Sequence, residues 1–128
     1  MIRGLGIDVV EVRRIEEAME NPRFVDRILT ADERPAVITP PFVAGRWAAK
    51  EAVAKAVTLR LRWHDIEILN DAHGKPYVRF ATPDRNDPTM TLAPALIEAG
   101  YRVASQIHIS ISHERGIASA VAIWEEEP

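Results

Sequence analysis

The order of the predicted elements indicates an α+β fold, in which an antiparallel-rich sheet packs against a long central helix and shorter helices. One strand precedes three helical segments, a hairpin, a short helix and a second hairpin, which is not the repeated βαβ pattern of a parallel sheet. The second observation is an alanine-rich segment, residues 42–56, without an internal proline. The third is an alternation of apolar and polar residues near the C-terminus. We expect residues 1–128 to form a single domain.

The first strand is predicted over residues 2–9. It contains Gly4 and Gly6, and glycine inside a strand often marks the close approach of another backbone or a ligand. Asp8 ends this strand and begins a capping-box pattern, so its simplest predicted role is the N-cap of a helix that reaches about residue 20. A shorter helix follows. Arginines on these two helices are usually solvated, and the alternative is a docking patch formed by Arg13, Arg14, Arg23 and Arg27.

The central helix is predicted from about Pro41 to Leu59. Another capping-box pattern, Thr30 to Glu33, opens a short helical turn before it, and Thr39 is placed to cap the long helix. Small residues recur at helical spacing and predict a stripe that lies close against a sheet or another helix. These residues are Gly45, Ala48, Ala49, Ala52 and Ala56.

Charged residues lie off this stripe in two pairs. Arg46 and Lys50 are four positions apart, and so are Glu51 and Lys55, so each pair shares a side of the helix. From this segment alone, the simpler interpretation is an amphipathic helix with a salt-bridged solvent face. The alternative is a rigid helix that carries cations and a carboxylate to a site.

The second half of the chain predicts two hairpins with a short helix between them. Turn-forming residues join the strands of the first hairpin, and Gly100 suits the end of the helix. In the second hairpin, isoleucines point to one side, and serines and histidine point to the other. The predicted ranges are 65–70 and 76–80 for the first hairpin, 93–99 for the helix, and 106–112 and 117–124 for the second hairpin.

Composition excludes several classes of function. The chain has no cysteine, which rules out disulfides, thiol nucleophiles and thiolate metal sites and fits a reducing cytoplasm. No apolar run approaches the ~18 residues of a membrane span. The net charge of −3 argues against a general nucleic-acid binder. The first 64 residues carry +2 and the rest −5, so the basic residues concentrate around the central helix and suit phosphates or an acidic partner.

Three separate segments are candidates for one site. They contribute Asp8 from the first strand, Glu51 and Lys55 from the central helix, and Ser112 and His113 from the last hairpin. Two carboxylates can hold Mg²⁺, which completes its octahedron with water and substrate phosphates, and nearby cations suit a polyphosphate. There is no Walker loop or complete dinucleotide fingerprint. Taken alone, His113 is more simply a turn residue than a ligand or base.

Three sequence blocks resemble the signature blocks of the bacterial holo-acyl-carrier-protein synthases, the small 4′-phosphopantetheinyl transferases. They are Gly-Leu-Gly-Ile-Asp8, Arg46-Trp-Ala-Ala-Lys-Glu-Ala-Val-Ala-Lys55 and Ile109-Ser-Ile-Ser-His113. The pattern Trp-x-x-Lys-Glu-Ala-x-x-Lys is highly specific, and the likeness covers nearly the whole chain. It is weakest at residues 31–41, where many relatives look longer, and at 82–92. The resemblance implies a 4′-phosphopantetheinyl transferase-like fold.

The resemblance also implies an activity. Such an enzyme moves phosphopantetheine from coenzyme A to a serine of an acyl carrier protein or carrier domain, releases adenosine 3′,5′-bisphosphate, and serves fatty acid biosynthesis. By this resemblance, Asp8 and Glu51 hold Mg²⁺, and Asp8 caps its helix through a different oxygen. Lys55 neutralises the attacked phosphate. Glu51, directly or through a metal-bound water, helps to deprotonate the carrier serine.

The remaining implied contacts concern coenzyme A, the carrier and a second copy of the chain. Arg46, Lys50, Lys55 and His113 would surround the phosphates, Gly74, Lys75 and Pro76 would flank the adenosine, and Ser112 would position the nucleotide. The acidic carrier would dock on Arg14, and on Arg13, Arg23 and Arg27. The resemblance implies a homotrimer with active sites between subunits. Two other interpretations are a non-catalytic nucleotide-binding regulatory oligomer on the same scaffold and a structural α+β module.

Overall fold

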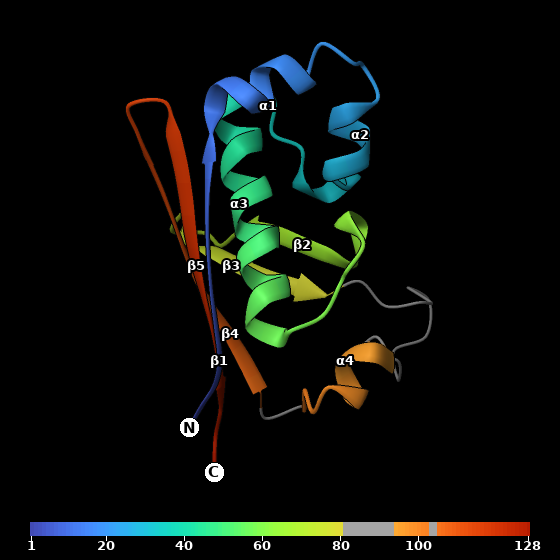
Figure 1. The fold of residues 1–128 in the computed structure, drawn as a ribbon, viewed down its shortest axis with the longest axis vertical. Coiled ribbons are helices and arrows are strands. Elements are labelled where there is room, and N and C mark those ends of the chain that lie inside the picture. Colours follow the sequence, from blue (N-terminus) through green and yellow to red (C-terminus); the bar gives the residue numbers. More distant parts are fainter. Residues whose placement is uncertain (81–93, 103–104) are drawn as a thin grey trace.

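A three-stranded antiparallel sheet carries the long helix on one face (Figure 1). The computed structural model describes residues 1–80, 94–102 and 105–128. The sheet has the order β1-β5-β4, so β5 lies between two edge strands. The long helix, α3, spans Pro40–Val57 and packs against all three strands. The strands are β1 (Ile2–Glu11), β4 (Ser105–Glu114) and β5 (Ile117–Glu126).

The contact between β1 and α3 is unusually close because two glycines face the helix. A Cβ atom on Gly4 would lie 1.9 Å from the carbonyl oxygen of Ala56, and one on Gly6 would lie 1.9 Å from that of Ala52. Such contacts leave no room for a side chain. Ala48, like Ala52, is fully buried. The close approach predicted from the strand glycines and the alanine stripe is therefore confirmed.

The helix-cap role predicted for Asp8 is wrong. β1 continues through Asp8 to Glu11, and the N-cap position of α1 (Val12–Ala18) is Glu11, without a side-chain capping bond. The reason is tertiary pairing, since β5 continues alongside and Glu11 pairs with Ile117. The backbone N–H of Val12 then donates to Gly116 O at 2.8 Å. Asp8 is therefore a strand residue whose carboxylate is not used for capping.

Other predicted helix signals are confirmed. The hydroxyl of Thr39 accepts from Phe42 N at 3.3 Å at the start of α3, and the helix ends at Thr58, which has a left-handed φ of 57°. Within the short helix η1, the carboxylate of Glu33 accepts from Thr30 N at 3.0 Å. Between α1 and α3 lie the helices α2 (Phe24–Ile28) and η1 (Ala31–Glu33).

A second, two-stranded sheet lies across α3 (Figure 1). It follows the short helix η2 and is the predicted first hairpin. The predicted short helix is α4, and Gly100 beyond it has a positive φ of 98°. The predicted loop at 82–92 lies outside the described residues. No helix in the described ranges is long and apolar enough to cross a membrane. The bounds are η2 (Trp63–Asp65), β2 (Ile66–Asn70), β3 (Pro76–Phe80) and α4 (Pro94–Glu98).

Candidate active site

Asp8, Glu51 and Lys55 come together where β1 meets α3. The strand glycines fix the helix against β1, and Lys55 Nζ donates to Asp8 Oδ1 at 3.2 Å and to Ile7 O at 2.9 Å. Glu51 lies one helical turn before Lys55. Burial raises the pKa of Glu51, the negative charge of Asp8 raises it further, and Lys55 partly opposes both. The two carboxylates are therefore close enough to repel each other.

This carboxylate pair suits Mg²⁺ better than zinc. Across the described ranges, no group of three or more His, Cys, Asp or Glu residues could hold a metal. Zinc in proteins takes three or four such ligands, whereas Mg²⁺ is often bound through one or two carboxylates plus water and substrate phosphates. The oxygen donors of Asp8 and Glu51 thus match the second pattern, and Lys55 adds a cation for a phosphate.

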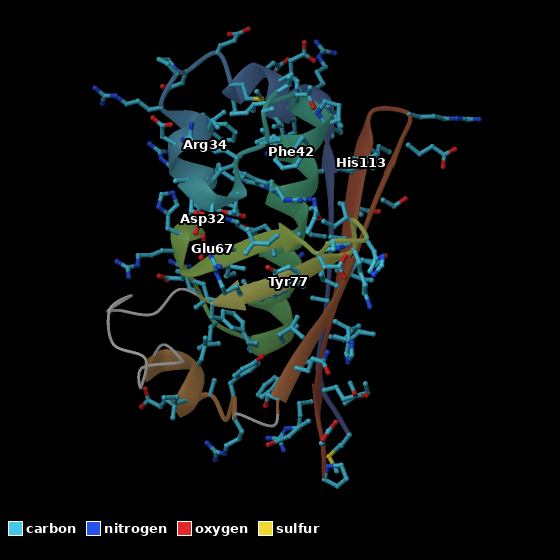
Figure 2. All side chains as sticks on the ribbon, turned by 180° about the vertical axis from the view of Figure 1, so that it is seen from behind. Asp32, Arg34, Phe42, Glu67, Tyr77 and His113 are labelled. Atoms are coloured by element: carbon cyan, nitrogen blue, oxygen red, sulfur yellow. The ribbon has the colours of Figure 1, made fainter. Side chains whose placement is uncertain are left out.

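His113 lies beside the N-terminal end of α3 (Figure 2). Its Nε2 lies 2.9 Å from Pro41 O. Because a carbonyl oxygen only accepts, Nε2 carries the hydrogen and donates it. Gly45 makes room for the ring, since a Cβ atom there would lie 2.6 Å from Nε2. His113 is thereby held, exposed, at the start of the helix.

Arg46 forms the wall of a small cavity near the first hairpin. The cavity has a volume of about 180 Å³, and its lining includes Arg34, Phe42 and Asn70. Arg46 is 7% exposed, its guanidinium lies over the Phe42 ring, and its Nη2 donates to Asn70 Oδ1 at 3.2 Å. Its buried Nε has no hydrogen-bond partner among the described residues. Burial lowers the pKa of Arg46, and the carboxylate of Glu33 opposes this shift.

The phosphate contact predicted for Lys50 is contradicted by its surroundings. Lys50 is 2% exposed. Its ammonium donates to Ile28 O at 2.6 Å, to Glu33 Oε1 at 2.6 Å and to Trp63 O at 2.8 Å. An ammonium has three hydrogens, and all three are used. Lys50 therefore holds the interior of the protein together and has no donor left for a nucleotide.

The predicted adenosine-flanking residues form the turn between β2 and β3. Asp71 Oδ1 accepts from His73 N at 2.8 Å and from Lys75 N at 3.0 Å. Gly74 has a φ of 81°, which favours glycine. Lys75 is exposed and Pro76 begins β3. The turn thus presents backbone and one ammonium to solvent.

One chain does not bring all the predicted residues together. Asp8 is on β1 and His113 on β4, the two opposite edges of the sheet, so roughly 10 Å of strand spacing separates them. Helix α3 covers the space between, because it contacts β1 at Gly6 and β4 at Gly45. Ser112 precedes His113 in the strand and therefore faces the other side of the sheet. Within one chain, the carboxylate pair (the first half-site) and His113 with Arg46 (the second half-site) are therefore apart from each other.

The four arginines predicted to contact a partner lie near the other end of the molecule from α4. Arg13, Arg14, Arg23 and Arg27 are all exposed, in or beside α1 and α2 (Figure 1). Arg13 Nε donates to Glu17 Oε1 at 3.2 Å. Sequence reasoning missed Asn70, which orients Arg46, and the interior role of Glu33, for which the capping-box pattern predicted only the start of a short helix.

The sequence and structure of this chain are similar to those of known proteins. A family model described as the 4′-phosphopantetheinyl transferase superfamily matches residues 4–104. A holo-[acyl-carrier-protein] synthase of Solidesulfovibrio magneticus is 45% identical over 134 residues, covering 98% of this chain and 99% of that protein. One from Alkaliphilus metalliredigens is 41% identical over 132 residues, covering 95% of this chain and 99% of that protein. The crystal structure of a Bacillus anthracis holo-(acyl-carrier-protein) synthase in complex with CoA (3′,5′-ADP) matches with a TM-score of 0.76 and 34% identity, covering 99% of both chains.

Proposed function

The chain belongs to the 4′-phosphopantetheinyl transferase superfamily, and on that premise we propose that it acts as a holo-acyl-carrier-protein synthase. It transfers the 4′-phosphopantetheine group of coenzyme A to a serine of an acyl carrier protein. The serine oxygen forms a bond to the phosphorus on the pantetheine side, the pyrophosphate P–O bond breaks, and adenosine 3′,5′-bisphosphate leaves. The observation that carries this proposal is the meeting of Asp8, Glu51 and Lys55 at the junction of β1 and α3.

We assign the metal site to Asp8 and Glu51. Bound there, Mg²⁺ would supply charge neutralisation and orientation of the pyrophosphate. The fit rests on two hard oxygen donors held close together, as the effect of Asp8 on the pKa of Glu51 indicates.

Glu51 and Lys55 carry the chemical roles in this proposal. In the metal-free chain, burial and the charge of Asp8 raise the pKa of Glu51, and this carboxylate is the one placed to take the serine proton. Lys55, whose side chain is 53% exposed, is able to leave Asp8 for the phosphate that is attacked. Little covalent work falls to the protein in phosphoryl transfer, because positioning and charge neutralisation dominate.

The nucleotide end of coenzyme A is assigned to the second half-site. His113 and Arg46 would contact the phosphates, and the turn of Gly74, Lys75 and Pro76 would flank the adenosine. The role implied for Ser112 stays a prediction, because its side chain faces the other side of the sheet from His113. Arg46 suits this role, because a guanidinium presents a fork of donors that matches phosphate oxygens. Lys50 is removed from the set, since its donors are all used inside the protein.

We further propose a homotrimer in which adjacent protomers complete each active site. The separation of Asp8 from His113 supports it, and so does the uncovered face of the sheet. On that face Leu5 is 64% exposed, and it pairs with Ile123 of β5. Exposed apolar patches of this kind mark interaction sites. The face comprises Leu5, Ile7, Val9, Ile117, Val121 and Ile123.

Light scattering on a size-exclusion column tests the assembly. The wild-type chain should elute with the mass of a trimer, and Leu5→Glu should shift it to monomers and remove transfer. A wild-type monomer that is fully active would refute an inter-subunit site. Docking of an acidic carrier on Arg13, Arg14, Arg23 and Arg27, a role in fatty acid biosynthesis and a cytoplasmic location remain predictions from the resemblance.

Intact-mass spectrometry of the carrier tests the reaction itself. The protein is incubated with coenzyme A, Mg²⁺ and an apo acyl carrier protein, and the carrier should gain one phosphopantetheine. A carrier with its acceptor serine changed to alanine is the control and should gain nothing. If coenzyme A binds but no tested carrier gains mass, the transferase proposal fails and the regulatory nucleotide-binding oligomer takes its place.

A further inference from the structure

Three of the most deeply buried charged side chains lie away from the carboxylate pair, under the first hairpin. Lys50 and Glu67 are each 2% exposed and Glu33 is 4% exposed. The mechanism proposed above uses none of them. Buried charges are costly unless each is paired and hydrogen-bonded, so such a cluster has a defined geometry.

Glu33 is the centre of this cluster. Its Oε1 accepts from Lys50 Nζ at 2.6 Å and from Thr30 N at 3.0 Å. Its Oε2 accepts from Ile68 N at 2.9 Å. One carboxylate therefore joins three elements: helix α3 through Lys50, the turn η1 through Thr30, and strand β2 through Ile68.

A second set of contacts ties the same hairpin to η1. Glu67 Oε2 accepts from the Thr30 hydroxyl at 2.6 Å, and Glu67 Oε1 accepts from Arg79 Nε at 3.1 Å. Arg79, on β3, also donates to Asp32 Oδ2 at 2.8 Å. Figure 2 shows Asp32 and Glu67 close together where η1 meets the hairpin. Both strands of the hairpin are therefore anchored to η1.

Strand β2, anchored in this way, leads directly to the second half-site. Two residues after Ile68, Asn70 accepts from Arg46 Nη2 at 3.2 Å. The turn with Gly74 and the start of β3 follow. Because Lys50 lies one helical turn from Arg46, the pair Lys50–Glu33 fixes both the helix and the strand between which Arg46 and Asn70 meet.

We propose that Glu33 and Lys50 form a positioning pair for the binding of coenzyme A. The pair fixes hairpin β2–β3 on α3, and it thereby orients Arg46, through Asn70, toward the nucleotide phosphates. The identity of the ligand rests on the proposed function. Burying an ion pair often gives no more stability than apolar residues of similar volume. The hydrogen bonds of this pair instead define one position of the hairpin. Lys50 donates three and Glu33 accepts three, and the bond between the two residues belongs to both sets.

Steady-state kinetics of Glu33→Gln, with both substrates varied, test this role. The amide cannot accept at both of its ends, so the bond to Ile68 N or the contact with Lys50 is lost. The KM for coenzyme A should rise about tenfold or more, because the hydrogen-bonded Arg46 is misplaced. The KM for the carrier and kcat at saturation should stay within about threefold of wild type. Calorimetric titration with adenosine 3′,5′-bisphosphate, which needs no turnover, should show a similar loss of binding affinity in Glu33→Gln.

Two further variants separate positioning from plain stability. Ile15→Val truncates the core at α1, where Ile15 is 3% exposed, and should lower Tm without changing either KM. Asn70→Ala changes an exposed residue at the other end of the same chain of contacts. It should raise the KM for coenzyme A with little change in Tm. If Glu33→Gln does not fold, the Asn70→Ala result decides.

A folded Glu33→Gln protein with an unchanged KM for coenzyme A would overturn the inference. If Glu33→Gln does not fold, an unchanged KM for coenzyme A in Asn70→Ala would overturn it. These failures differ from failure of the proposed function. If the wild-type protein transfers normally and Glu33→Gln has the same KM for coenzyme A, only the positioning role is refuted. If the wild-type protein binds the nucleotide but modifies no carrier, only the transferase proposal is refuted, since calorimetry still measures the effect of Glu33→Gln on nucleotide affinity.

Discussion

Replacing Gly45 with alanine should displace His113 without unfolding the protein. The added Cβ atom would lie 2.6 Å from His113 Nε2, against about 3.4 Å for an ordinary contact, so the ring must move by about 0.8 Å. The atom that it meets is the end of a side chain and can move, unlike the backbone oxygens that face Gly4 and Gly6. The 2.9 Å bond to Pro41 O would break.

Two opposing terms set the effect of Gly45→Ala on stability. Alanine is favoured over glycine in a helix interior by about 1 kcal/mol. The lost hydrogen bond costs about 1 kcal/mol, so the free energy of unfolding should change little. If His113 contacts a phosphate, loss of that charge-assisted bond is worth about 1.5–3 kcal/mol, which lowers kcat/KM for coenzyme A roughly 10- to 150-fold.

The assay is kcat/KM for coenzyme A at saturating carrier, beside urea unfolding, for Gly45→Ala, His113→Ala and the double variant. In the His113→Ala background, Gly45→Ala should cost no further activity. It should raise the free energy of unfolding by at most about 1 kcal/mol, because the added Cβ atom still lies 3.2 Å from Ile111 Cγ2. The reasoning is refuted if Gly45→Ala alone keeps wild-type kcat/KM. It is also refuted if the two activity losses multiply, because Gly45 would then act on something other than His113.

Three more predictions concern Glu51, Arg14 and Thr58. Glu51→Gln should lose about 10²–10⁴-fold in kcat. The raised pKa of Glu51 means that the unfolded chain ionises more readily, so this carboxylate reduces stability at neutral pH, and Glu51→Gln should melt no lower than wild type there. In the metal-free wild-type protein, the pKa of Glu51 should lie above that of an ordinary glutamate, as an NMR titration of its carboxyl would measure. Arg14→Glu should raise the KM for the carrier several-fold and spare that for coenzyme A, whereas Arg60→Glu, beyond the other end of α3, should change neither. Thr58→Gly should add about 1 kcal/mol of stability, because Thr58 has a left-handed φ of 57°.

Each of these predictions has an outcome that contradicts it. Unchanged turnover in Glu51→Gln would remove Glu51 from the site, and a Tm well below wild type would mean that its carboxylate stabilises the fold. Equal losses for both substrates in Arg14→Glu, or equal effects of Arg14→Glu and Arg60→Glu on the carrier, would place docking elsewhere. A lower urea midpoint for Thr58→Gly would show that the threonine side chain makes contacts that outweigh its backbone strain.

The sequence predicts most of the fold because its local signals agree with the tertiary packing. Gly4 and Gly6 predicted a close approach, and the backbone of α3 lies against them. Thr39 caps α3 as its position indicated. That Glu51 and Lys55 share a side of the helix was also predictable, since they are four residues apart, whereas the resemblance was needed to favour their meeting with Asp8.

The predictions for Asp8 and Lys50 failed for one physical reason. The type and spacing of side chains do not reveal which distant residues they will contact in the folded chain. The capping-box pattern at Asp8 was overridden by strand pairing, which continues to Glu11 opposite Ile117. The resemblance implied a phosphate contact for Lys50, but the side chain is buried, as lysine rarely is. Its partner Glu33 lies 17 positions away, and nothing local in the sequence indicates that the two meet.

The backbone contact between Gly6 and Ala52 has a consequence for the charges beside it. Two elements in direct backbone contact cannot slide past each other, so strand and helix hold their side chains as one rigid body. Asp8 and Glu51 are thereby kept from spreading apart to relieve their repulsion, which the raised pKa of Glu51 reflects. The fold stores this repulsion before any ligand arrives. A cation bound between the two carboxylates would release it, so binding there should raise the melting temperature, and more strongly at a pH where both are ionised.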